Sequence, residues 1–237
     1  MEYTVEKIGE KISVCISRDH RFGTDAFLLC DFAAHKQNDT VCDFGTGCGI
    51  IPLLMSRSKP PKRIYAVDIQ PEATELLKKS LELSDIHGIE PICADLNEWR
   101  ELPAGSVSLV TCNPPYKAAN AGIESVGGAQ KIARHEIMCD IAGICAAAAR
   151  ILKFGGRLCV CNRPERLADT VKAMQQSGIE PKLLRMVSKT PTDAPWLFLL
   201  EGKKGSRPFM KILPQLYTWD GDEFSAELKA IYAGDRE

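Results

Sequence analysis

The chain has 237 residues, of which 45% are hydrophobic and 26% are charged, and its formal net charge is −1. This is a globular composition, and the length is sufficient to bury one sizeable core, so we expect one domain with small additions. The nearly balanced charge argues against a protein coated in positive charge for nucleic acid, although it leaves room for a local basic patch.

Neither a membrane segment nor a metal site is expected. No apolar run reaches the about 18 residues of a membrane span, and the N-terminus MEYTVEKIGEK lacks the basic-then-apolar order of a signal peptide. We therefore expect a cytoplasmic protein. The ten cysteines are scattered through apolar runs, and the one close pair, Cys159 and Cys161, lacks zinc-like spacing. We interpret them as reduced thiols of the core.

Hydrophobic patterning predicts an N-terminal hairpin and helix, followed by alternating strands and helices. The hairpin includes a strand at 11–16, and the helix spans 24–35, with Thr24 or Asp25 as its cap. Strands bounded by helices imply right-handed crossovers and a parallel sheet covered on both faces. The strands are expected at 40–44, 63–68, 91–95, 107–112, 156–162, 180–188 and 196–204, and the helices at 50–57, 71–88, 133–152, 166–177 and 222–233.

A glycine-rich turn, DFGTGCG (43–49), follows the first strand of the sheet. Gly45, Gly47 and Gly49 would let the backbone approach a ligand closely. The third glycine of a dinucleotide fingerprint would fall at position 50, which is Ile50, and the sequence of a phosphate loop is missing here. An acid facing the turn, Asp43, favours a cationic or amine-bearing cofactor over a pyrophosphate. S-adenosylmethionine fits that description.

Two further acids end the next two strands. Asp68 ends the second strand, where a carboxylate can accept both hydroxyls of a ribose. Asp95 ends the third, within reach of an adenine amino group. We include their neighbours Ile69 and Leu96 in the same predicted site. Solvated strand ends are the alternative interpretation of each acid.

The tetrapeptide Asn113-Pro114-Pro115-Tyr116 follows the apolar strand 107–112. The prolines stiffen the turn and lack N–H groups, so the turn presents carbonyl acceptors, to which Asn113 adds its side-chain oxygen. Two acceptors aimed at one point can bind both hydrogens of an –NH2 group and direct its lone pair at an electrophile. Tyr116 offers a flat face on which a planar substrate can stack. An ordinary proline-rich turn is the alternative.

With these motifs in order, the chain resembles class I S-adenosylmethionine-dependent methyltransferases, and its NPPY sequence resembles their amino-methylating branch. RFGTDAFLLCDFA (21–33), ARHE (133–136) and the closing segment 207–232 resemble bacterial tRNA1(Val) adenine-N6-methyltransferases. The resemblance implies an α/β, Rossmann-like fold with a seven-stranded, mostly parallel sheet whose last strand is antiparallel. It also implies a single methyltransferase domain over 1–237, with an extension at 1–38, a catalytic core at 39–204 and a C-terminal extension at 205–237.

The resemblance further implies residue roles, with S-adenosylhomocysteine as the product and tRNA as the partner. Asn113 and the Pro114 carbonyl would accept the two N6 hydrogens of a splayed-out adenine, and the segment 117–130 would cover the site. The implied cofactor-binding residues are Thr24, Asp25, Asp43, Gly45, Gly47, Gly49, Asp68, Ile69, Asp95, Leu96 and Asn113. The implied catalytic residues are Asn113, Pro114 and Tyr116, and the implied substrate contacts are Pro115, Tyr116, Lys117, Arg134 and His135.

Two other functions stay open. A protein-glutamine methyltransferase acting on a release factor would use the same acceptors, but residues 1–38 resemble a hairpin and one helix rather than the longer helical domain usual in those enzymes. A noncatalytic module that binds cofactor or RNA is the other alternative, which the intact Asn113 and glycines argue against. Excess positive charge between Lys182 and Lys211 favours RNA as the acceptor.

Overall fold

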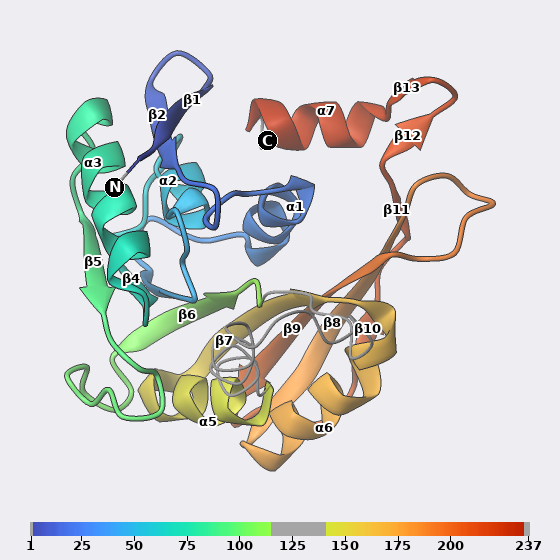
Figure 1. The fold of residues 1–237 in the computed structure, drawn as a ribbon. Helices are drawn as coiled ribbons and strands as arrows, with labels where there is room; N and C mark the ends of the chain where they lie inside the picture. Colours follow the sequence, from blue (N-terminus) through green and yellow to red (C-terminus); the bar gives the residue numbers. More distant parts are fainter. Residues whose placement is uncertain (1, 115–140, 235–237) are drawn as a thin grey trace, which may run out of the picture.

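The computed structural model describes residues 2–114 and 141–234 (Figure 1). An antiparallel hairpin opens the chain, and β2 is buried along its whole length while β1 is mostly exposed. The backbone N–H groups of Ser13 and Cys15 in β2 donate to the hydroxyls of Ser84 and Ser80 in α3. The hairpin is thus docked against that helix. These elements are β1 (Thr4–Ile8), β2 (Ile12–Ile16), α1 (Thr24–Ala33) and α3 (Pro71–Ser84).

The central sheet confirms the predicted seven-stranded arrangement and extends it. Its order is β8-β9-β7-β6-β3-β4-β5, and β9 runs antiparallel to both of its neighbours while the other pairs are parallel. Two short strands, β10 and β11, pair with β8 and bring the sheet to nine strands. The strands are β3 (Thr40–Phe44), β4 (Arg63–Asp68), β5 (Ile89–Cys93), β6 (Val107–Cys112), β7 (Leu152–Asn162), β8 (Ile179–Ser188), β9 (Leu197–Lys204), β10 (Lys211–Ile212) and β11 (Leu216–Tyr217).

Helices cover the sheet on both faces (Figure 1). α1, α2 and α3 lie on one side, where α7 packs against α1, and α5 and α6 lie on the other. A small hairpin of β12 and β13 precedes α7. The remaining elements are α2 (Ile50–Met55), α5 (Ile141–Ile151), the short helix η1 (Pro164–Arg166), α6 (Leu167–Gln176), β12 (Trp219–Asp220), β13 (Glu223–Phe224) and α7 (Ala226–Ala233).

The core is divided in two by the sheet, as the alternation of side chains in its strands shows. In β9, Leu197 and Leu199 belong to the cluster beneath α1, whereas Phe198 and Leu200 belong to the cluster beneath α5 and α6. All four are buried. Because both faces are covered, residues 197–200 of this strand are all apolar, and the sequence there shows a continuous hydrophobic run instead of an alternation.

Several boundaries differ from those predicted. The helix predicted to reach 88 ends at Ser84, because Asp85 takes a left-handed conformation (φ 49°) and its N–H caps the preceding turn. β5 begins at Ile89, two residues before the predicted strand, and tolerates Pro91 because it forms the edge of the sheet. Gly23, without a side-chain bond, caps α1 in place of Thr24 or Asp25. The helix predicted at 133–152 is described from Ile141, and the segment 117–130 lies outside the described residues.

Of the nine cysteines in the described part of the chain, which form no disulfide with one another, eight are buried and Cys93 is exposed. Over residues 2–114 and 141–234, no group of three or more His, Cys, Asp or Glu side chains could hold a metal ion. Within the same residues, none of the helices is long and apolar enough to cross a membrane.

Asp43 is a buried acid in the middle layer of the molecule, with only 1% of its surface exposed. Thr111 of the neighbouring strand β6 donates its hydroxyl to Asp43 Oδ1 at 2.6 Å. Burial raises the pKa of the Asp43 carboxyl to about 7, because desolvation outweighs the hydrogen bond from Thr111, which lowers it, and the Asp68 charge raises it further.

This shift predicts a pH-dependent stability. The pKa of Asp43 lies above its ordinary range in the folded state, so between about pH 4 and pH 7 the folded chain keeps a proton that the unfolded chain loses. The contribution of the protonated Asp43 to the free energy of unfolding is therefore complete below about pH 4 and is lost as pH rises to about 7. Urea unfolding from pH 4 to 8 should show wild type losing up to about 4 kcal/mol relative to Asp43→Asn, at 1.36 kcal/mol per pKa unit. A difference that does not vary with pH would contradict the assignment.

Candidate active site

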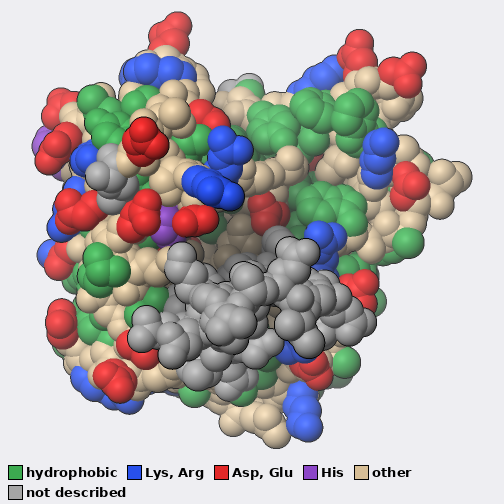
Figure 2. Space-filling model, viewed as in Figure 1, with side chains coloured by type: hydrophobic (Ala, Val, Ile, Leu, Met, Phe, Trp, Pro, Cys, Tyr) green, Lys and Arg blue, Asp and Glu red, His purple; other side chains and the backbone are tan. Residues whose placement is uncertain are grey.

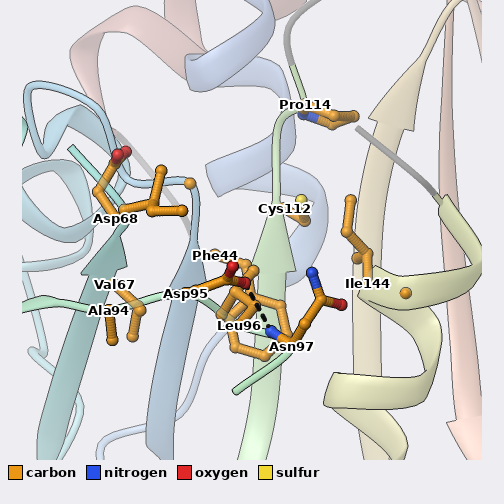
Figure 3. Close-up of a pocket in the computed structure, with 13 residues that line it drawn as sticks. Phe44, Val67, Asp68, Ala94, Asp95, Leu96, Asn97, Cys112, Pro114 and Ile144 are labelled. Carbon is orange, nitrogen blue, oxygen red and sulfur yellow. Dashed lines mark hydrogen bonds between the residues drawn. The ribbon is translucent and has the colours of Figure 1, made fainter. Parts of the chain in front are cut away.

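A pocket lies at the carboxyl ends of β3, β4, β5 and β6, where the order of the strands reverses between β3 and β6 (Figure 3). Such a reversal is the usual ligand-binding position of an open α/β sheet. The empty space within it, including its open mouth, is about 620 Å³. It is lined by Phe44, Gly45, Val67, Asp68, Ile69, Ala94, Asp95, Leu96, Asn97, Cys112, Pro114, Gly143 and Ile144.

The glycine turn after β3 is tied to the end of β4. Gly47 N–H donates to Asp68 Oδ2 at 2.9 Å, and Thr46 N–H donates to the Val67 carbonyl at 3.0 Å. Gly47 takes a positive φ of 54°, which a side chain would disfavour. The turn is therefore held in one shape by the strand beside it.

The three glycines of this turn have different roles. Gly45 lines the pocket, whereas Gly47 makes the bond to Asp68. Gly49 lies at the start of α2, where an added Cβ would come within 2.3 Å of the Leu77 side chain in α3. Gly49 thus also allows close packing between two helices, and the role of the three glycines in ligand approach stays a prediction.

The two predicted acids Asp68 and Asp95 both line the pocket. Asp68 is nearly buried and accepts backbone N–H groups from both sides, Gly47 at 2.9 Å and Gln70 at 2.9 Å. Asp95 follows the end of β5, and its Oδ1 accepts the Asn97 N–H at 2.9 Å (Figure 3). Both carboxylates are thus oriented by the backbone next to the cavity.

Other predicted cofactor residues lie outside this lining. Asp43 lies beneath the turn and bonds Thr111. Thr24 bonds the hydroxyl of Tyr232 in α7 at 2.7 Å. Asp25 accepts a hydrogen bond from Asn113 Nδ2 at 3.1 Å. The structure therefore groups Gly45, Asp68, Ile69, Asp95 and Leu96 around the pocket, with Pro114, and places Asp25 and Asn113 together beside it.

Asn113 is held at the end of β6 by two different elements. Its Nδ2 donates to Asp25 Oδ2 of α1, and its Oδ1 accepts from the Cys161 thiol of β7 at 3.1 Å. Pro114, the next residue, lines the pocket. The predicted residues Pro115, Tyr116, Lys117, Arg134 and His135 lie outside the described residues.

Sequence inspection missed seven lining residues, of which Phe44, Val67 and Ala94 each directly precede a predicted site residue. Asn97 and Cys112 adjoin predicted site residues in sequence, so the strand ends could have indicated them. Gly143 and Ile144 come from α5, a helix that follows β6 in the chain and is distant in sequence from the glycine turn. No motif marks them, because their position follows from how α5 packs on the sheet.

The cavity suits an adenosyl cofactor. Apolar side chains, including Leu96 and Ile144, can enclose a flat base, and the Asp68 carboxylate can accept ribose hydroxyls. Two carboxyl groups beside the cavity, those of Asp68 and Asp95, also favour a ligand with positive charge, such as a sulfonium. The residues present therefore fit S-adenosylmethionine.

The curated relatives of this chain that are similar in sequence carry the names of methyltransferases. The chain is 26% identical over 215 residues to a tRNA1(Val) (adenine(37)-N6)-methyltransferase of Histophilus somni, covering 89% of this chain and 88% of the relative. It is 27% identical over 142 residues to the enzyme of that name from Cronobacter sakazakii, covering 59% of this chain and only 57% of the relative. A release factor glutamine methyltransferase of Mycolicibacterium smegmatis is 29% identical over 168 residues, covering 65% of this chain and 57% of that protein.

Solved structures share the fold. A predicted O-methyltransferase from Agrobacterium tumefaciens superposes with a TM-score of 0.73 at 21% identity, over 89% of this chain and 96% of that one. M. jannaschii TYW2 in complex with AdoMet gives a TM-score of 0.54 at 18% identity, over 85% of each chain. The family model of the methyltransferase small domain matches residues 17–177. The chain therefore belongs to the methyltransferase small domain family, within the S-adenosylmethionine-dependent methyltransferases of Rossmann-like fold.

Proposed function

We propose that this chain transfers a methyl group from S-adenosylmethionine to the N6 amino group of an adenosine in tRNA. One observation carries the chemistry. Pro114 lines the pocket at the strand ends, and its neighbour Asn113 is held by its side-chain amide at the end of the same strand. An amine acceptor and a methyl donor can therefore meet at the end of β6.

The cofactor, when bound, supplies an electrophilic methyl group on a positively charged sulfur. Asp68 and Asp95, which line the pocket, would hold it at the two strand ends. Asn113 Oδ1 and the Pro114 carbonyl accept the two hydrogens of the acceptor amine, which orients the nitrogen lone pair and stabilises the positive charge that develops on nitrogen. The nitrogen would attack the methyl carbon with both hydrogens in place as the S–CH3 bond breaks, so that S-adenosylhomocysteine would leave and one proton on nitrogen would pass to solvent afterwards. Positioning would therefore be the main catalytic contribution.

The acceptor class rests on the relatives. The Histophilus relative, which aligns over 88% of its own length, has a name that specifies adenine N6 in a tRNA. A base inside a helical stack cannot present its amino group to a pocket, so the nucleotide must be splayed out, which is easiest in a loop. Tyr116 completes this proposal as the ring on which the base stacks.

The positively charged stretch from Lys182 to Lys211 supports RNA as the acceptor less strongly than the sequence suggested. Lys182 Nζ donates to the Arg207 carbonyl at 3.1 Å, and Arg185 pairs with Glu227 at 2.7 Å. Positive and negative side chains are intermixed on the face shown in Figure 2. Part of the positive charge between Lys182 and Lys211 is thus matched within the chain, and the proposal for tRNA does not depend on it.

A second candidate is the glutamine of a release factor. The Mycolicibacterium relative supports it, and a side-chain amide presents the same two hydrogens to Asn113 and Pro114. The described N-terminal part, a hairpin followed by α1, differs from the helical domain that release factor enzymes were expected to carry.

The acceptor can be identified directly. The protein is incubated with S-adenosylmethionine labelled in the methyl group, together with either bulk unmethylated tRNA or a release factor, and the products are digested and separated. We expect label in N6-methyladenosine from the tRNA arm only. Label confined to the release factor would contradict the tRNA proposal, and no label in either arm would favour a binding module.

Substitutions at Asn113 and at Asp68 should affect different constants, kcat in the first case and the cofactor Kd in the second. Asn113→Ala should lower kcat by about 10²–10³, the cost of losing one preorganised polar group, with cofactor Kd within about twofold. Asp68→Ala should instead raise cofactor Kd by about 10–100-fold, since it removes a charge-assisted hydrogen-bond acceptor. Because this substitution also removes the acceptor of the Gly47 N–H, the thermal unfolding of the variant must be measured to show that it is folded.

The matched control is Asn162→Ala, an asparagine at the end of the neighbouring strand β7 whose Oδ1 accepts the N–H of Arg163. It should leave both constants unchanged. Near-normal turnover of Asn113→Ala would show that the assigned mechanism is wrong.

A further inference from the structure

Asn113 and Asp25 are joined by a long-range contact that the cofactor assignment of Asp25 does not explain. The two residues are 88 positions apart in the chain, and Asn113 Nδ2 donates to Asp25 Oδ2 at 3.1 Å. The lining of the pocket includes Pro114 and Asp68 but neither of these two residues. The carboxylate of Asp25 is thus directed at the side chain of Asn113.

This contact selects one orientation of the Asn113 amide. An ionised carboxylate can only accept hydrogen bonds, whereas the two ends of an amide are a donor and an acceptor. Rotating the amide by half a turn would place Asn113 Oδ1 against Asp25 Oδ2, so that two acceptors would face each other. The Cys161 thiol reinforces the same orientation, because it donates to Oδ1 at 3.1 Å from the other side.

The orientation matters for the chemistry of the proposed function, on which this inference rests. An amine acceptor brings two N–H hydrogens, and only the oxygen end of the amide can accept them. An amide that turned over would present its own N–H groups to these hydrogens and would no longer orient the attacking nitrogen. Asn113 supplies the oxygen, and a second residue is needed to keep that oxygen directed at the acceptor amine.

The structure also holds Asp25 itself in place. Its Oδ1 accepts the Ala26 N–H at 3.0 Å in the first turn of α1. Two residues before it lies Gly23, where an added Cβ would come within 2.9 Å of Asp25 Oδ1. Thr24, between them, bonds the hydroxyl of Tyr232 in α7 at 2.7 Å. The start of α1 is thus built to leave room for the carboxylate and to anchor it.

We propose that Asp25 is a positioning residue that fixes the amide of Asn113 with its oxygen toward the acceptor amine, and that it is not a ligand of the cofactor. α1 then contributes to catalysis from outside the sheet, by setting the direction of a group at the end of β6. The proposal separates Asp25 from Asp68, whose carboxylate lines the pocket.

The test compares Asp25→Ala, Asp25→Asn and the control Asp19→Ala, which removes an exposed acid shortly before the same helix. Turnover is measured with the acceptor that takes up label, and affinity for S-adenosylhomocysteine is measured by calorimetry. Asp25→Ala should lower kcat about 10–100-fold, as loss of an orienting partner does, with the affinity within twofold. Asp25→Asn should recover part of the activity, because its one side-chain oxygen can take the place of Oδ2 and accept from Asn113 Nδ2, while the bond from the Ala26 N–H is lost. Asp19→Ala should behave as wild type.

Two outcomes would overturn the proposal. A parallel loss of affinity for S-adenosylhomocysteine in Asp25→Ala would make Asp25 a cofactor ligand, and full activity in that variant would remove its role. Gly23→Ala gives an independent check, since it leaves the carboxyl in the chain but displaces it. It should lower kcat in the same direction and leave affinity unchanged.

A double-mutant cycle keeps this inference distinct from the proposed function. The melting temperatures of cofactor-free wild type, Asp25→Ala, Asn113→Ala and the double variant should be non-additive, because the two side chains share one bond. Additive shifts would show that the contact is absent in solution and would overturn the inference. If no acceptor takes up label, the proposed function fails, while the cycle still decides whether Asp25 holds Asn113.

Discussion

The hydrogen bond between Gly47 and Asp68 is the constraint on which the cofactor side of the molecule depends. It joins the turn after β3 to the end of β4, and Asp68 is oriented a second time by Gln70. A carboxylate held in this way needs no rearrangement when a ligand arrives, so less binding free energy is lost to ordering the site. The cavity wall and its acceptor are therefore formed before binding.

The acceptor side is organised differently, by contacts between distant elements. Asn113 ends β6, yet the groups that orient its amide belong to α1 and β7. Preorganisation of polar groups lowers a barrier only if their direction is fixed in advance. The cofactor side relies on neighbouring strands, whereas the acceptor side relies on packing between the N-terminal helix and the sheet.

Patterns that are local in sequence predicted most of the fold and about half of the site. The apolar runs located the strands, and glycine spacing located the turn. The edge strand β5 was predicted to begin two residues late, because Pro91 interrupts its pattern. The partner of Asp25 and the packing of Gly49 against Leu77 could not be predicted, since each depends on segments that only the folded chain brings together. The basic stretch was overvalued for the same reason: the acid that pairs with Arg185 comes from α7.

The contact of Thr24 with Tyr232 has a consequence for how the chain tolerates change. It couples the first turn of α1 to the last helix, and the Phe27 ring packs edge-on against Tyr232, with centroids 4.8 Å apart. Loss of α7 would thus loosen the helix that carries Asp25, far along the chain from the reacting groups. The C-terminal segment cannot be trimmed or replaced as a free tail, and substitutions there can alter reaction rate without touching a ligand.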